Sequence, residues 1–177
     1  MGRIYYIDGY NVILQCPTLG AIAQRDLEGA RARLFQHVVH FCTDTGHRAV
    51  LVFDGRNASS FPSSEIGSTG QVQVVYSKGS RTADAVIERM VYEARHQHVE
   101  TVVVSADREI RELCSTLGAL VIQPGTFLGW MHDAQRRLRS EYTQQTAPRQ
   151  WYRMEDVLNE RSVHRLHAIR RRLEGKS

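Results

Sequence analysis

Residues 4–11 read IYYIDGYN, an apolar run that ends in Asp8 and continues into a turn sequence. Two later runs have the same form, since VLVFD ends in Asp54 and VVVSAD ends in Asp107. Short, nearly continuous apolar runs are typical of parallel strands that are buried on both faces. Residues at the carboxyl ends of such strands face the ligand crevice of an open α/β sheet. The three runs therefore predict a parallel sheet with aspartates gathered along one edge.

Strand and helix patterns alternate along the chain. The predicted strands cover about residues 3–7, 48–53, 71–76, 101–104 and 119–122. The predicted helices cover about residues 26–43, 82–97 and 107–117, with a loop through Pro17 and Gly20 before the first of them. This alternation predicts an α/β fold, an open parallel sheet of about five strands with helices on both faces. Helical sequence resumes after Pro124, and we place the domain at residues 1–142 and a basic helical tail at 143–177.

The charge is unevenly distributed along the 177 residues. Residues 1–135 hold 12 basic and 14 acidic side chains, whereas residues 136–177 hold 11 basic and 5 acidic ones. In the tail, Arg161, Arg165 and Arg172 share one stripe of a predicted helix. A cationic tail on an acidic body suits a polyanionic substrate, because arginines gain affinity from phosphates. The alternative is a solvated, arginine-rich helix.

Bulk composition excludes several classes of protein. No apolar run approaches the ~20 residues that a membrane helix needs, and no signal sequence precedes the first predicted strand. The three cysteines are widely spaced and form no CxxC pair, which predicts reduced thiols rather than a disulfide or zinc framework. We therefore expect a cytoplasmic protein that does not contact membranes.

A fourth acid, Asp84 in SRTADAVIE, falls in the first turn of a predicted helix. Each aspartate alone has an ordinary explanation, as a turn residue or as an acid stabilised by a helix N-terminus. Four acids at one sheet edge would repel one another unless a cation neutralises them. Hard oxygen ligands without nearby histidine or cysteine favour Mg²⁺ or Mn²⁺ over zinc. The sequence therefore predicts a divalent metal site and phosphoryl-transfer chemistry.

Several neighbours of the four aspartates are candidates to assist them. Asn11 offers a neutral oxygen or an amide donor beside Asp8, and Ser105 could hold a carboxylate or a metal-bound water. Glu88 lies one helical turn after Asp84, either as a further metal ligand or pointing to solvent. Basic residues near the acids are candidate ligands of a substrate phosphate, each with a solvated surface charge as the alternative: Arg56, Lys78 and Arg81.

The segments YIDGYNVI, VLVFDGR, a TAD helix start and VVVSAD, in that order, resemble the NYN family, particularly its YacP-like branch. The resemblance runs from residue 3 to about residue 140 and implies a PIN-like nuclease fold with metal-dependent endoribonuclease activity. The residues that match the family pattern are Asp8, Asn11, Asp54, Asp84 and Asp107. One departure is Ala85, which stands where many relatives carry a second acid.

We therefore expect an Mg²⁺- or Mn²⁺-dependent endoribonuclease that cleaves single-stranded RNA. The expected catalytic residues are Asp8, Asn11, Asp84 and Asp107, with Asp54 as a further metal ligand. Some YacP-like proteins are associated with ribosomes and cleave mRNA there, so the resemblance adds mRNA and the ribosome as expected partners. Two alternatives stay open. One is a non-catalytic RNA-binding module, and the other is a phosphatase or phosphorelay domain, although the chain lacks a paired DxD after the first strand.

Overall fold

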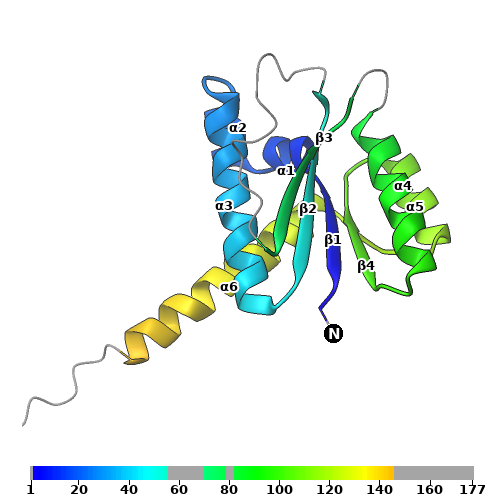
Figure 1. Cartoon of the computed structure of the whole chain (residues 1–177). Helices are drawn as coiled ribbons and strands as arrows, with labels where there is room; N and C mark the ends of the chain where they lie inside the picture. Colours follow the sequence, from blue (N-terminus) through cyan, green and yellow to red (C-terminus); the bar gives the residue numbers. More distant parts are fainter. Residues whose placement is uncertain (1, 56–69, 79–81, 146–177) are drawn as a thin grey trace, which may run out of the picture. The chain divides into compact units, whose positions relative to one another are not determined.

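A computed structural model describes residues 2–55, 70–78 and 82–145 of the chain, with side chains described as far as residue 137. Five parallel strands form one sheet in the order β3-β2-β1-β4-β5 (Figure 1). The strands are β1 Ile4–Asp8, β2 Arg48–Phe53, β3 Val72–Tyr76, β4 Thr101–Val104 and β5 Leu120–Ile122. The helices are α1 Gly9–Gln15, α2 Pro17–Ala23, α3 Leu27–Thr45, α4 Ala83–His96, α5 Arg108–Thr116 and α6 Pro124–Gln145. The predicted α/β fold is confirmed.

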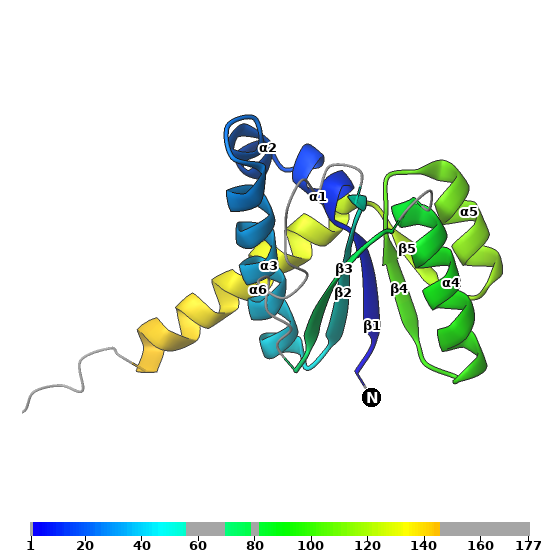
Figure 2. The same cartoon turned by 45° about the horizontal axis from the view of Figure 1, so that its top comes forward.

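Helices cover both faces of the sheet, as the two views in Figures 1 and 2 show, with α1, α2, α3 and α6 on one face and α4 and α5 on the other. Alternate strand residues point to opposite faces, so each face has its own apolar core. Ile7 and Leu51 belong to the core under α3, whereas Tyr6 and Val52 belong to the core under α4 and α5. The near-continuous apolar runs of the sequence follow from this double burial.

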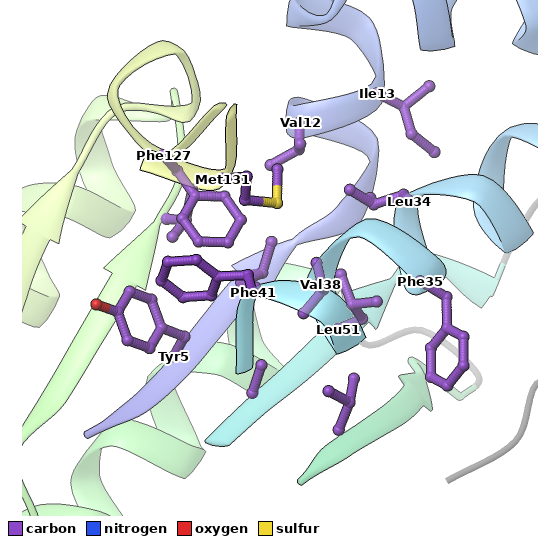
Figure 3. Close-up of a cluster of buried hydrophobic side chains, with 14 of the residues drawn as sticks. Tyr5, Val12, Ile13, Leu34, Phe35, Val38, Phe41, Leu51, Phe127 and Met131 are labelled. Carbon is purple, nitrogen blue, oxygen red and sulfur yellow. The ribbon is translucent and has the colours of Figure 1, made fainter. Parts of the chain in front are cut away.

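The core under α3 is closed by aromatic rings and by the start of α6 (Figure 3). Phe41 of α3 packs edge-to-face against Tyr5 of β1 and against Phe127 of α6, with both pairs of ring centroids 5.3 Å apart. Met131, one turn after Phe127, fills the remaining space beside Val12. This packing fixes the orientation of α1, which follows β1 directly, against α3.

The predicted loop through Pro17 and Gly20 is wrong, because α1 and α2 occupy this region. Asp8 caps α1 by accepting a hydrogen bond from the backbone N–H of Asn11. Pro17 stands at the first position of α2, where a missing N–H has no consequence. Helices of seven residues span two turns, which is too short for an apolar period to show in the sequence.

The chain divides into two units, Met1–Arg139 and Ser140–Ser177. Of the second unit, the structure describes only the end of α6. The predicted boundary after residue 142 stays a prediction, and the predicted tail helix with Arg161, Arg165 and Arg172 lies outside the described residues. None of the described helices is both long and apolar enough to cross a membrane.

A buried arginine joins α3 to the end of the sheet. The side chain of Arg31 is 1% exposed, and its guanidinium donates hydrogen bonds to Glu28 and to the hydroxyl of Tyr10. The same guanidinium lies over three aromatic rings, 5.2 Å from the centroid of Tyr10, 5.6 Å from that of Phe53 and 5.7 Å from that of Tyr76. Cation–π attraction adds to the hydrogen bonds in such a desolvated place.

We expect Arg31→Ala to lower the free energy of unfolding by about 3 kcal/mol, because it leaves a cavity among three rings and removes the partner of Tyr10. Arg31→Met should lower the free energy of unfolding less than Arg31→Ala does, because a flexible thioether fills the space without a buried charge. Urea denaturation of both variants and the wild type measures this. A loss below about 0.5 kcal/mol for Arg31→Ala, the size of an ordinary surface substitution, would contradict the structural role.

Candidate active site

The candidate site lies where the strand order reverses. The chain adds β2 and β3 on one side of β1 and then places β4 and β5 on the other side, so the crevice between the ends of β1 and β4 is a topological switch point. Ile7 pairs with Val104 across these two strands. Asp8 is therefore brought beside Ser105, which follows β4, although 97 residues separate them in the sequence.

Asp8 is a buried carboxylate at the end of β1, with only 7% of its surface exposed. Its Oδ1 accepts a hydrogen bond of 3.1 Å from the backbone N–H of Asn11, and its Oδ2 accepts one from the Asn11 side-chain amide. Burial raises the pKa of Asp8, the Asn11 bonds work in the opposite direction, and the charge of Asp107 raises it again. Asn11 thus holds Asp8 in a fixed orientation and favours its charged form.

Asn11 also connects β1 to the end of β4. Its amide donates to Ser105 Oγ at 3.4 Å, and the same oxygen accepts a 3.0 Å hydrogen bond from the backbone N–H of Asp107. Ser105 is completely buried. Ser105 therefore links the side chain of Asn11 to the turn that contains Asp107. The sequence indicated a supporting role for this serine but not these two hydrogen-bond partners.

Asp107 caps α5. Its Oδ1 accepts hydrogen bonds from the backbone N–H groups of Glu109 at 2.7 Å and Ile110 at 3.4 Å. Both bonds use the same oxygen, so the cap does not engage Oδ2. The ordinary explanation, an acid at a helix N-terminus, is thus correct for Asp107 and for Asp8. Asp107 is exposed, and its charge still acts on Asp8.

Asp84 lies in the first turn of α4, which Thr82 caps by accepting a 3.3 Å hydrogen bond from the backbone N–H of Ala85. Burial raises the pKa of Asp84, and the charges of neighbouring acids raise it further. These acids are Asp8, Asp107, Asp54 and Glu109. All four predicted aspartates therefore interact electrostatically at this edge of the sheet, as expected from the sequence.

Asp54 follows β2 and is held from the end of β3. The hydroxyl of Ser77 lies 3.4 Å from Asp54 Oδ1 and accepts a 2.9 Å hydrogen bond from the backbone N–H of Gly55. A Cβ on Gly55 would lie 2.1 Å from the carbonyl oxygen of Ser77, so this close approach requires glycine. Sequence analysis did not identify Ser77, because the residue belongs to no recognisable motif. Its position directly after a predicted strand was the only signal that it could contact the site.

Asp8, Asn11, Asp54 and Asp84 are among the residues that line a cleft with a volume of about 660 Å³. Within the described part of the chain, no three His, Cys, Asp or Glu side chains are placed so that they could hold a metal ion. The chemistry of the donor set nevertheless fits a hard cation, because it consists of carboxylate oxygens. Burial and then the charges of the neighbouring acids raise the pKa of Asp84, so these carboxylates repel one another. A bound divalent cation would relieve this repulsion.

The remaining predicted residues are less closely placed. Glu88 is exposed, one turn after Asp84, and is not among the described residues that line the cleft. Lys78 is exposed just beyond β3. The other predicted RNA-binding residues lie outside the described residues: Arg56, Arg81, Arg161, Arg165 and Arg172.

Comparisons with known proteins identify the family of this chain. The family model for the YacP-like NYN domain matches residues 5–171. The chain belongs to this family. The match extends well past residue 140, so it includes most of the basic tail and corrects the shorter range that the motifs indicate. A YacP-like NYN domain is a nuclease-like domain, and the family and the α/β fold predicted from the sequence are confirmed.

Similar proteins come from Bacillus subtilis. The "Uncharacterized protein YacP" of strain 168 is 31% identical over 87 residues, which cover 49% of this chain and 50% of that protein. The aligned region thus spans about half the length of this curated relative. Crystal structures of Rae1 (YacP) and of a tryptophan-to-leucine mutant of it each match this YacP-like NYN chain with a TM-score of 0.71 at 23% identity. The match to the mutant covers 94% of this chain and 99% of that one, and the match to the other structure covers 97% and 95%. These structures support the fold.

Proposed function

We propose that this chain is an endoribonuclease that uses Mg²⁺ or Mn²⁺ to cleave single-stranded RNA. The observation that carries the proposal is the gathering of Asp8, Asp54, Asp84 and Asp107 at the carboxyl edge of a parallel sheet, where burial and then the charges of the other three aspartates raise the pKa of Asp84. Such repulsion destabilises the protein unless the acids bind something positive. Membership of a nuclease-like family makes a phosphodiester the substrate that suits this site best.

In this proposal Asp8 and Asp84 hold the cation, directly or through water, with Asp54 and Asp107 as further oxygen ligands. When bound, the cation lowers the pKa of a water nucleophile and stabilises charge on the phosphoryl oxygens. The two hydrogen bonds from Asn11 orient Asp8 and favour its charged form, in opposition to burial, which raises the pKa of Asp8. Ser105 and Ser77 position the neighbouring turns, so their roles are structural support for the acids.

The tail beyond residue 135 has a surplus of basic residues, which suits RNA. Within this class of substrate, mRNA at the ribosome is what the resemblance to the YacP-like branch implies. A cytoplasmic location stays a prediction. The second candidate function is a non-catalytic RNA-binding module, which is favoured by Ala85 and by the use of Asp8 and Asp107 as helix caps.

Cleavage of a single-stranded RNA by the full chain, with Mg²⁺, Mn²⁺ or excess EDTA, separates these two candidates. We expect cutting with either metal and none with EDTA. The same metals should raise the melting temperature of the wild type, because the acids converge only in the folded state, and should do so much less for Asp8→Asn. RNA binding without cutting would favour the module, and an equal rise in both melting temperatures would place the metal elsewhere.

A further inference from the structure

The cleft that Asp8, Asp54 and Asp84 line also has apolar lining residues. They come from α1, α2 and the start of α3, and we refer to them as the apolar side of the cleft: Tyr10, Ile13, Leu14, Ala23 and Leu27. The exposed Gln24 lines the same cleft, which has a volume of about 660 Å³. An apolar wall beside a cluster of carboxylates does not help to bind a cation, so it requires another explanation.

Leu14 is the most unusual of these residues, because 76% of its surface is exposed. It lies three positions after Asn11 and four after Tyr10, so all three share one face of α1. The neighbouring Val12 and Ile13 are almost completely buried and provide the packing of this helix. Leu14 is therefore not needed for the core, and its position beside Asn11 places an apolar surface next to the candidate metal ligands.

Tyr10 is held rigidly at the same wall. The guanidinium of Arg31 lies 5.2 Å from the ring centroid and donates a hydrogen bond to the hydroxyl. The ring of Phe53 meets it at 69°, with the centroids 5.3 Å apart. Tyr10 nevertheless remains partly exposed and lines the cleft. A ring fixed in this way loses little conformational entropy when a flat ligand packs against it.

We infer that the apolar side of the cleft binds one unpaired nucleobase of RNA, with Tyr10 and Leu14 packing against the base and the amide of Gln24 reaching its polar edge. This inference rests on the proposed function, because it requires a phosphodiester at the acids. A nucleotide joins a flat, apolar base to a charged phosphate, and the cleft joins an apolar wall to a cation site. Bases within a duplex are stacked and paired, so this wall selects single strands.

The experiment measures binding of the full chain to a short single-stranded RNA and to an oligomer of the same length whose sugar–phosphate chain carries no bases. Leu14→Ala should weaken binding to the intact RNA about fivefold, the order expected when a leucine loses its apolar contact with a ligand. It should leave binding to the abasic oligomer unchanged, and its melting temperature should match the wild type. Tyr10→Leu should weaken intact RNA binding about tenfold or more, whereas Tyr10→Phe, which keeps the ring, should retain most of it.

Leu120→Ala is the matched control, since Leu120 is a leucine with 49% exposure on β5 and lies outside this cleft. It should bind both oligomers like the wild type. Equal losses on intact and abasic RNA for Leu14→Ala, no loss on either, or no preference of the wild type for intact RNA would overturn the inference. Binding is scored separately from cutting, so a chain that prefers intact RNA but never cleaves it would refute the proposed nuclease and keep the base site.

Discussion

Replacing Asp84 with asparagine should lower the rate of RNA cleavage by at least about 100-fold, because it removes one charge from the set that would hold the cation. Asp8→Asn should have a similar effect, since Asp8 is the most buried of the four aspartates and the one that Asn11 orients. The loss should appear in kcat more than in RNA affinity. Single-turnover cleavage at saturating RNA measures it directly.

The same substitution should not destabilise the protein. The pKa of Asp84 is raised in the folded state by burial and by the other acids, so folding favours its neutral form. Because the pKa of Asp84 is higher in the folded than in the unfolded state, protonation of Asp84 stabilises the folded state at low pH. This stabilisation is lost as the pH rises through the folded-state pKa. At neutral pH in EDTA, Asp84→Asn should therefore melt at or above the wild-type temperature, with the difference shrinking as the medium is acidified.

Asp133→Asn is the control for both measurements, because it removes an aspartate from an exposed position on α6. It should change neither the cleavage rate nor the pH dependence of melting. If Asp84→Asn and Asp8→Asn cut RNA as fast as the wild type, the acids at this edge do not carry the chemistry. A large drop in melting temperature for Asp84→Asn would show instead that its charge stabilises the fold.

Gly9→Ala should lower the free energy of unfolding by about 2–3 kcal/mol and abolish most cleavage. A Cβ at this position would lie 2.2–2.6 Å from three atoms of the Phe53 ring, and Phe53 is fully buried. Because that ring also contacts Tyr10 and Tyr76, it has little room to move. The start of α1 must then shift, and it carries Asp8 and Asn11. Thermal and urea denaturation together with the cleavage assay measure both effects.

Gly129→Ala is a matched comparison within α6. Nothing lies within 4 Å of a Cβ placed on Gly129, so the substitution meets no neighbour. Alanine is more stable than glycine in the interior of a helix, so the free energy of unfolding should rise by about 0.5–1 kcal/mol. The cleavage rate should not change. If Gly9→Ala proved as harmless as Gly129→Ala, the close approach of Gly9 to Phe53 would not constrain the site.

The amino-acid sequence by itself determined which segments are strands and where the acids lie. Strands buried on both faces require continuous apolar runs, and this pattern is visible in IYYID, VLVFD and VVVSAD without any partner. The longer helices α3 and α4 were also readable, because their apolar periods repeat over several turns. The caps Asp26, Thr82 and Asp107 mark the starts of α3, α4 and α5, each one residue before its helix. The position of Asp84 relative to the cap Thr82 followed from the same pattern.

Only the tertiary structure decided how these acids are held and what lies beside them. The contact from Asn11 to Ser105 spans 94 residues and exists because β4 pairs with β1, a strand order that no local pattern encodes. The burial of Arg31, against the usual preference of arginine for solvent, depends on rings supplied by three separate segments. The apolar wall of the cleft depends on α1 and α2, whose seven residues each are too few to show a period. The spacing of apolar residues in the sequence shows which face of each segment is buried. The candidate site depends instead on which segments become neighbours in the folded protein, and the sequence pattern does not show this.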